Sequence, residues 1–232
     1  MQLKDSKKLK SYHDLKQRVL TLELSPGSAL DVVALSAEYG LSRTPLREVF
    51  HRLAGEGYLS LASNKGASVS SIDLATMRNF FQSAPMIYAA IARLACEQAS
   101  TAQINAVKKT QARFHKAMKT SKAQDMVVHN HRLHEQLGEM AASPYLTPSL
   151  GRLLIDHARM SQRFYRVGEA SSRQRIAKAS EQHDAMIEAI EQRNAAMCVD
   201  LTMQHWELSR REMDKYVLPD PLPIDIATDL AG

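Results

Sequence analysis

The sequence lacks the features of a secreted or membrane-spanning protein. Only two of its 232 residues are cysteines, Cys96 and Cys198, and neither belongs to a Cys-x-x-Cys pair. Two thiols so far apart exclude a disulfide framework, and we expect them to be free and buried in a reducing compartment. No run of about 18 apolar residues is present, and the first residues lack an apolar signal segment. We therefore expect a cytoplasmic protein that makes no membrane contact.

Aromatic residues are also scarce, at 6%, whereas alanine, leucine, methionine and charged residues are common. This composition favours helices, and a hydrophobic content of 44% is sufficient for a packed core. A length of 232 residues suits two domains of unequal size. The net charge is +5, and residues 1–66 carry ten lysines and arginines against seven acidic residues. This charge fits either a mildly basic protein or an end that meets DNA phosphates, so the residue pattern has to distinguish them.

The first 71 residues predict three helices followed by a β-hairpin. Polar residues 1–8 are expected to be frayed, and a helix over 9–24 is expected to end at the turn Ser25-Pro26-Gly27. A second helix, over 31–39, can be capped at its start by Asp31, and Gly40 can supply the left-handed residue after its end. A third opens at Ser42 as N-cap, carries Pro45 in its first turn and ends at Gly55 and Gly57. Segments 58–62 and 67–70 flank an Asn/Gly turn and predict the hairpin.

After residue 71 the pattern is helical throughout. We expect a mainly α protein with a winged helix-turn-helix domain over 1–71, an all-helical bundle of six to seven helices over 72–217, and an extended or loose tail over 218–232. The first bundle helix is expected to be bent or split at Pro85. The predicted bundle helices cover 73–99, 101–120, 123–141, 145–166, 170–193 and 194–216.

The third helix has the properties of a DNA-reading element. Its apolar residues share one face, so the opposite face, which carries Arg43 and Arg47, must be exposed. The N-terminus of a helix attracts phosphate, and two arginines four residues apart can reach guanine edges in the major groove. Lys65, beside Gly66 at the hairpin tip, can approach a phosphate or the minor groove. A solvated arginine face is the other interpretation, but the order of cap, proline, apolar face and hairpin favours DNA binding.

These residues resemble the GntR family of bacterial regulators. The resemblance covers residues of about 10–70 and rests on the Pro-Gly turn, the segment SRTPLRE and the segment LAGEGYL with its later G-x-x-V. It implies a homodimer on a roughly palindromic double-stranded DNA site, because one recognition helix reads only a few base pairs. It also implies that DNA is contacted by Ser42, Arg43, Thr44 and Arg47 on the helix and by Asn64, Lys65 and Gly66 in the wing.

Histidines are the second chemical signal. Asn130 and His134 are four residues apart on one helix face, and His183 and His205 lie on two later helices. Three imidazoles and one amide oxygen from three helices can converge in a bundle and bind a transition metal. Hydrogen-bonded core histidines are the alternative that the sequence leaves open. We interpret His13, His51, His129, His131 and His157 as ordinary core or surface residues.

Residues of about 75–215 resemble the FCD-type sensor domain of FadR-like GntR regulators. The metal-binding version carries D-x-x-x-H, then H-x-x-I-x-x-A-I, then a further histidine, and here the three histidines match. The resemblance implies Asn130, His134, His183 and His205 as ligands of a divalent ion, zinc or nickel. Asn130 replaces the usual aspartate, which should weaken binding because its oxygen is uncharged. Ala84 and Tyr88 align with a usual arginine and glutamate, so the cation for an effector could instead be Arg159 or Arg163.

The resemblance implies a transcription regulator, which we expect to be a repressor. A small carboxylate effector bound at or beside the metal would reshape the bundle and change the spacing of two DNA-binding heads. One alternative is a dimeric DNA-binding regulator with structural histidines and no metal. Another is a metal-dependent hydrolase, but His134-Glu135 is followed by Gly138 and lacks the second histidine of H-E-x-x-H, so we expect no enzyme.

Overall fold

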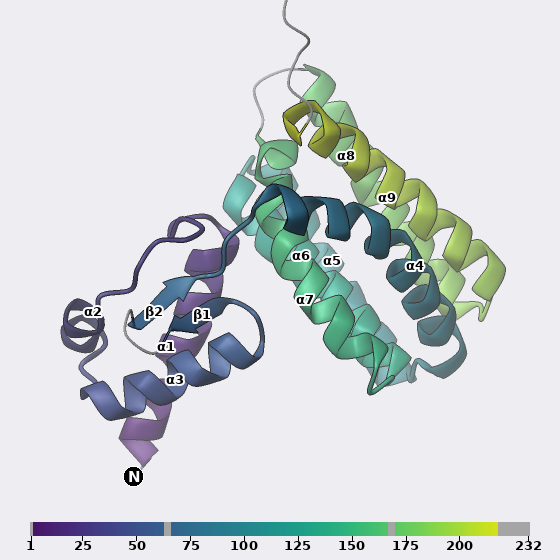
Figure 1. The fold of residues 1–232 in the computed structure, drawn as a ribbon. Helices are drawn as coiled ribbons and strands as arrows, with labels where there is room; N and C mark the ends of the chain where they lie inside the picture. The colour runs from purple at the N-terminus through teal and green to yellow at the C-terminus, as the bar shows by residue number, and fades with distance from the viewer. Residues whose placement is uncertain (1, 63–65, 167–169, 218–232) are drawn as a thin grey trace, which may run out of the picture.

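The computed structural model describes residues 2–62, 66–166 and 170–217 (Figure 1). The predicted tail over 218–232 and the wing residues Asn64 and Lys65 lie outside the described residues, as does the side chain of Arg163. No helix in the described residues is long and apolar enough to cross a membrane.

The N-terminal part contains α1 (Gln2–Leu20), α2 (Val32–Tyr39), α3 (Arg43–Gly55) and two strands. The predicted boundaries of the first helix were wrong at both ends, because α1 begins at Gln2 and ends four residues before Leu24. In its first part Lys8 forms an ion pair with Glu48 of α3, a contact that local sequence does not reveal. The end comes early because Leu22 adopts a left-handed backbone conformation with φ 59°.

Helix α2 is capped as the sequence predicted. The Asp31 carboxylate accepts hydrogen bonds from the backbone N–H groups of Val33 and Ala34, at 2.8 and 3.1 Å. Gly40 follows the helix in the left-handed region, where its N–H reaches the last turn. The cap and the glycine fix the two ends of α2, and a short connection then leads into α3.

Strands β1 (Leu59–Ala62) and β2 (Gly66–Val69) form the predicted antiparallel hairpin, with Leu59 opposite Val69. A bridge from Ala29 to Ser68 ties the loop before α2 to the hairpin. Three helices with a hairpin beside the third are a winged helix-turn-helix (Figure 1).

The remaining helices form a bundle in which α4 packs against α6, α7 and α9, and α5 packs against α6 and α8. Helix α4 contains Pro85 and is continuous through it, and Figure 1 shows it curved rather than split. The predicted helix over 145–166 is divided, because a 3₁₀ helix, Ser161–Tyr165, follows α7. The bounds are α4 Leu74–Gln98, α5 Thr101–Lys119, α6 Ala123–Ala141, α7 Leu146–Met160, α8 Ala170–Glu191 and α9 Ala195–Val217.

One apolar core joins the winged part to the nearer end of the bundle. It contains Leu15, Leu46 and Phe50 from the first and Phe114 and Ile155 from the second. A second core fills the rest of the bundle and includes both cysteines, which are free and buried as predicted. Because the first core crosses between the two parts, a change in the bundle can be transmitted to the winged part by packing.

A buried arginine strengthens this junction. Arg159 of α7 has a fully buried side chain, donates a hydrogen bond of 2.6 Å to the Ser70 carbonyl oxygen and pairs with Asp156. Ser70 directly follows β2, so the guanidinium connects α7 to the chain segment between the hairpin and α4. Arg152 also pairs with Asp156, at 2.7 Å, but its side chain is 42% exposed.

Arg159→Lys is therefore expected to lower the free energy of unfolding by about 1–3 kcal/mol, because lysine cannot satisfy both buried acceptors. Arg152→Lys serves as the matched control, with an expected loss of about 1 kcal/mol or less for an exposed pair. Urea unfolding of the two variants measures the difference. Equal losses would show that Arg159 does not hold the junction.

Candidate nucleic-acid interface and metal centre

Helix α3 divides into a buried and an exposed face. Pro45, Leu46, Val49, Phe50 and Leu53 are buried. Ser42, Arg43, Thr44 and Arg47, the residues predicted to meet DNA, are all exposed. Ser42 stands at the N-cap position, as predicted, with an extended backbone, and its side chain makes no capping hydrogen bond. Its hydroxyl therefore remains available to a ligand at the helix start.

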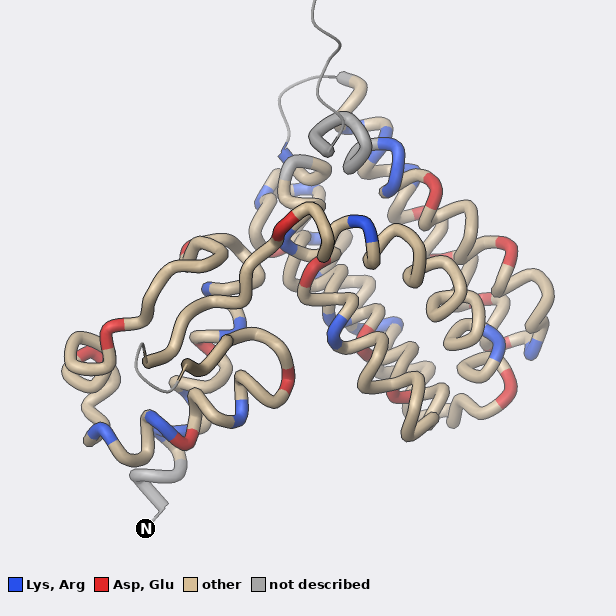
Figure 2. Tube along the Cα trace, viewed as in Figure 1, with Lys and Arg blue, Asp and Glu red and all other residues tan. Residues whose placement is uncertain are grey.

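The arginines of α3 differ in what they contact. Arg52 lies over the Tyr12 ring at 3.9 Å and pairs with Glu56 at 3.2 Å, so it serves the packing of α1 on α3. In the described part of the chain, no hydrogen bond or ion pair involves Arg43 or Arg47. Their charges are thus uncompensated by the protein. Figure 2 shows basic positions recurring along α3 at the edge of the winged part.

A hollow between α3 and the hairpin continues this face. Arg47 and His51 line it from α3, and Leu61 and Gly66 line it from the strands. Gly66 has φ +73°, a conformation that favours glycine, and its position leaves open space. Of the three predicted wing residues, Gly66 alone is described, and it lies beside this hollow. The helix start, two unpaired arginines and the hairpin together form one surface that can enter a DNA groove.

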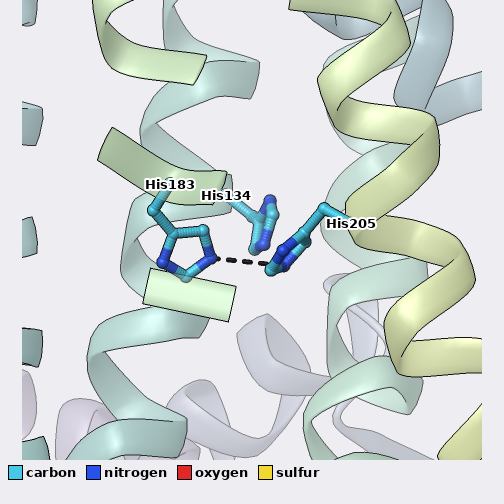
Figure 3. Close-up of side chains that lie close together, drawn as sticks. All are labelled: His134, His183 and His205. Atoms are coloured by element: carbon cyan, nitrogen blue, oxygen red, sulfur yellow. Dashed lines mark hydrogen bonds between the residues drawn. The ribbon is translucent and has the colours of Figure 1, made fainter. Parts of the chain in front are cut away.

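Three predicted ligands come together in the bundle. His134 of α6, His183 of α8 and His205 of α9 each offer a ring nitrogen, and these nitrogens lie within 4.8 Å of one another (Figure 3). The Nε2 atoms of His183 and His205 are 3.2 Å apart. Two nitrogens bound to one ion at about 2.0–2.1 Å lie about 3–3.4 Å from each other, so this spacing suits a shared ion. All three side chains are buried.

Burial keeps these imidazoles in the neutral form, which is the form that binds a metal. It lowers the pKa of His205 to about 4. Burial, followed by the neighbouring His205, holds the pKa values of His134 and His183 well below the usual range.

The hydrogen bonds around the cluster fit a bound ion. Gln182 accepts a hydrogen bond from Nδ1 of His205 at 3.1 Å, which leaves the lone pair on the Nε2 that faces His183. His134 Nε2 and Asn130 Oδ1 are buried and have no hydrogen-bond partner. A bound ion would give both atoms a partner. Asn130, the fourth predicted ligand, lies one turn before His134 on α6.

Comparison with known proteins agrees with this architecture. The family described as "Bacterial regulatory proteins, gntR family" matches residues 8–69, and the FCD domain matches residues 85–208. The chain belongs to the GntR family and carries an FCD domain. The families and relatives that this chain matches are transcription regulators rather than enzymes.

Individual relatives match it over parts of their length. The Nta operon transcriptional regulator of Aminobacter aminovorans is 34% identical over 79 residues, which are 34% of this chain and 38% of that protein. The transcriptional repressor RspR of Escherichia coli is 25% identical over 130 residues, 56% of this chain and 57% of the relative. These matches thus span well under two thirds of either relative. The solved structure of E. coli McbR/YncC shares the fold, with a TM-score of 0.75, 17% identity and coverage of 91% of this chain and 99% of that one.

Sequence reasoning missed the aromatic surroundings of the histidines in this FCD domain. His157, interpreted from sequence as an ordinary residue, is buried and its ring centroid lies 6.0 Å from that of His134. The Tyr88 hydroxyl and His157 Nδ1 are 2.8 Å apart, and the Tyr88 ring packs on His134 and Trp206. Burial lowers the pKa of His157 to about 3, so a neutral imidazole lies beside the Tyr88 hydroxyl. Tyr88 stands where the family resemblance places a charged residue. That departure was the signal in the sequence for these aromatic surroundings.

The remaining candidates do not join the cluster. The Arg159 guanidinium, predicted as an effector contact, is occupied by Ser70 and Asp156 at the junction of the two parts. His131 contacts the Leu154 carbonyl oxygen, the Tyr58 hydroxyl and Glu135, which fits its interpretation as a core residue.

Proposed function

We propose that this GntR regulator is a homodimeric, cytoplasmic repressor whose FCD domain holds a zinc or nickel ion and responds to a small carboxylate. The observation that carries the proposal is the convergence of three buried, neutral imidazoles from three helices. The ion would be held by His134, His183, His205 and the Asn130 amide oxygen. When bound, it would supply a Lewis-acidic centre that attracts a carboxylate oxygen.

Helix α6 is the proposed connection between this site and DNA. Asn130 and His134 lie on its side toward the cluster, whereas the next residue after each, His131 and Glu135, contacts the winged part. His131 lies 3.5 Å from the Tyr58 hydroxyl, and Glu135 lies 3.5 Å from the Lys16 ammonium. A rotation of α6 when the site is filled would therefore move Tyr58 beside β1 and Lys16 of α1.

The proposal of repression rests on the similarity to RspR of Escherichia coli, which is named as a transcriptional repressor. A repressor of this form would bind its operator through α3 and release it when the carboxylate fills the site. Two copies would be needed, because a single recognition helix contacts only a few base pairs and a palindromic operator supplies two half-sites.

The dimer is directly testable. Sedimentation velocity of the full chain at micromolar concentration is expected to give a species of twice the 25.9 kDa chain mass. Operator half-sites should be centred about 34–36 Å apart, or a multiple of that distance, as measured by footprinting. A monomer at this concentration would contradict paired half-sites.

Metal analysis separates this proposal from a regulator with structural histidines. The purified chain should retain zinc or nickel, lose it to a chelator and regain it on addition of the ion. The thermal unfolding temperature should rise when the ion is added, because a ligand that binds only the folded state stabilises that state. If neither content nor unfolding temperature responds to the ion, the histidines are structural and the sensor proposal fails.

A further inference from the structure

Two buried thiols have no part in the proposed function. Cys96 lies near the end of α4 and Cys198 near the start of α9, and both side chains are fully buried. Their thiols are hydrogen-bonded to each other, and the Cys96 thiol also donates to the Ala189 carbonyl oxygen of α8 at 3.3 Å. Two thiols that are far apart in the sequence thus meet where three helices come together.

The surroundings of this thiol pair are apolar and polarisable. Ala95 and Ala99 are buried in the same core as both cysteines. One turn after Cys198, the Thr202 hydroxyl contacts the Met186 Sδ atom at 3.2 Å. Within the described ranges, neither cysteine belongs to a group of three or more histidine, cysteine or acidic side chains. The pair therefore does not supply the four ligands that a structural zinc site uses.

Both thiols are held in the protonated form. Burial raises the pKa of each, and that of Cys198 reaches about 12. Because the thiolate is the form that attacks oxidants, these thiols are poor targets for peroxide, and a regulatory disulfide is not favoured. A soft metal ion can still bind here, because it displaces the thiol protons as it binds.

A neighbouring arginine favours a low-charge ion at this place. Arg193, in the turn between α8 and α9, donates hydrogen bonds to the carbonyl oxygens of Cys96, at 2.8 Å, and of Ala99. Its positive charge favours the thiolate form of Cys96, against the effect of burial. Two thiolates and one monovalent ion together carry a single negative charge, which this guanidinium can balance.

We propose that Cys96 and Cys198 form a binding site for the soft monovalent ion Cu(I), because two buried thiols meet in an apolar core beside one guanidinium. As the ion binds, the two thiols release two protons to solvent, and no electron is transferred. The bound ion would join the end of α4 to the start of α9. This site goes beyond the proposed function and does not depend on it, because it uses none of the histidine ligands.

Competition for Cu(I) between the full-length, fully reduced protein and bathocuproine disulfonate, without oxygen, tests the site. The chelator complex is coloured, so its loss of absorbance counts the ions that the protein withdraws. The wild type should withdraw about one Cu(I) per chain that Cys96→Ser and Cys198→Ser each fail to withdraw. His183→Ala is the control, and it should still withdraw this ion because it retains both thiols. A higher pH should raise the affinity, because binding releases protons.

The outcomes separate this site from the histidine site. A folded wild type that withdraws no Cu(I) would overturn the proposal, as would equal withdrawal by the wild type and both serine variants. Loss of Cu(I) uptake in His183→Ala, with uptake kept in the serine variants, would assign the ion to the histidines instead. If the wild type binds Cu(I) through the cysteines but takes up neither zinc nor nickel, the proposed function loses its metal while this site stands.

Circular dichroism and thermal unfolding show whether each variant is folded. Cys96→Ala and Cys198→Ala replace any serine variant that does not fold, because alanine leaves no hydroxyl group in the apolar core. Folded alanine variants that withdraw as much Cu(I) as the wild type would also overturn the proposal.

Discussion

Replacing His183 with alanine is expected to abolish metal binding by the FCD domain. The His183 side chain is fully buried, and its Nε2 lies 3.2 Å from the Nε2 of His205. Removing it deletes one of three imidazole ligands and leaves a cavity where the ion would sit. Metal content should fall from about one ion per chain to near zero, and the rise in unfolding temperature caused by the ion should disappear.

His129→Ala is the matched control for this variant. His129 lies on α6 beside the proposed ligand Asn130, but its side chain is only partly buried and it does not belong to the three-histidine cluster. The metal content of the His129→Ala variant should equal that of the wild type. Equal metal content in His183→Ala and the wild type would remove the site from the bundle. A His183→Ala chain that fails to fold can be replaced by His183→Gln, which retains a polar side chain of similar reach.

Arg43→Ala and Arg47→Ala are each expected to weaken specific DNA binding by about 1–3 kcal/mol, which is roughly five- to 150-fold. Both side chains are exposed on α3 and make no hydrogen bond or ion pair with the described residues, so truncation should leave the fold intact. The measurement is a shift assay at fixed salt with the operator and with an unrelated duplex. Specific affinity should fall more than non-specific affinity if the guanidinium groups read base edges.

Arg93→Ala controls for the loss of one positive charge. Arg93 is exposed on α4, in the helical bundle, and it is not part of the surface formed by α3 and the hairpin. Its substitution should change operator affinity little. If Arg43→Ala and Arg47→Ala bind the operator as well as Arg93→Ala does, α3 is not the recognition helix.

The two sites are connected by a junction that combines buried polar contacts with an apolar core. Arg159, His131 and Glu135 join the bundle to Ser70, Tyr58 and Lys16, while the apolar core beneath them is continuous. Packed cores change between discrete arrangements rather than deforming gradually, so a shift of α6 can reach the winged part. A coupling free energy of about 1–3 kcal/mol between the sites would change operator affinity about 5–150-fold.

Local chemistry in the sequence was enough to predict most of the fold. Asp31 and Gly40 mark the two ends of α2, and the apolar spacing of Leu46, Val49 and Phe50 fixes the buried face of α3. Capping, glycine conformation and helical periodicity act within a few residues, so they can be read from the sequence directly. The exposure of Arg43 and Arg47 follows from the same periodicity.

Tertiary structure decided what depends on residues distant in the chain. Lys8 of α1 pairs with Glu48, and the role of Arg159 depends on Ser70. The pairing of Glu135 and Asp184 away from the histidines depends on Lys16 and His115. Sequence spacing placed His134, His183 and His205 on the inner faces of three helices. Only the packing of those helices brought their nitrogens within 4.8 Å, with no acid of the described residues among them. Charge balance in a buried site is a property of all the neighbours at once, which is why periodicity along one helix could not reveal it.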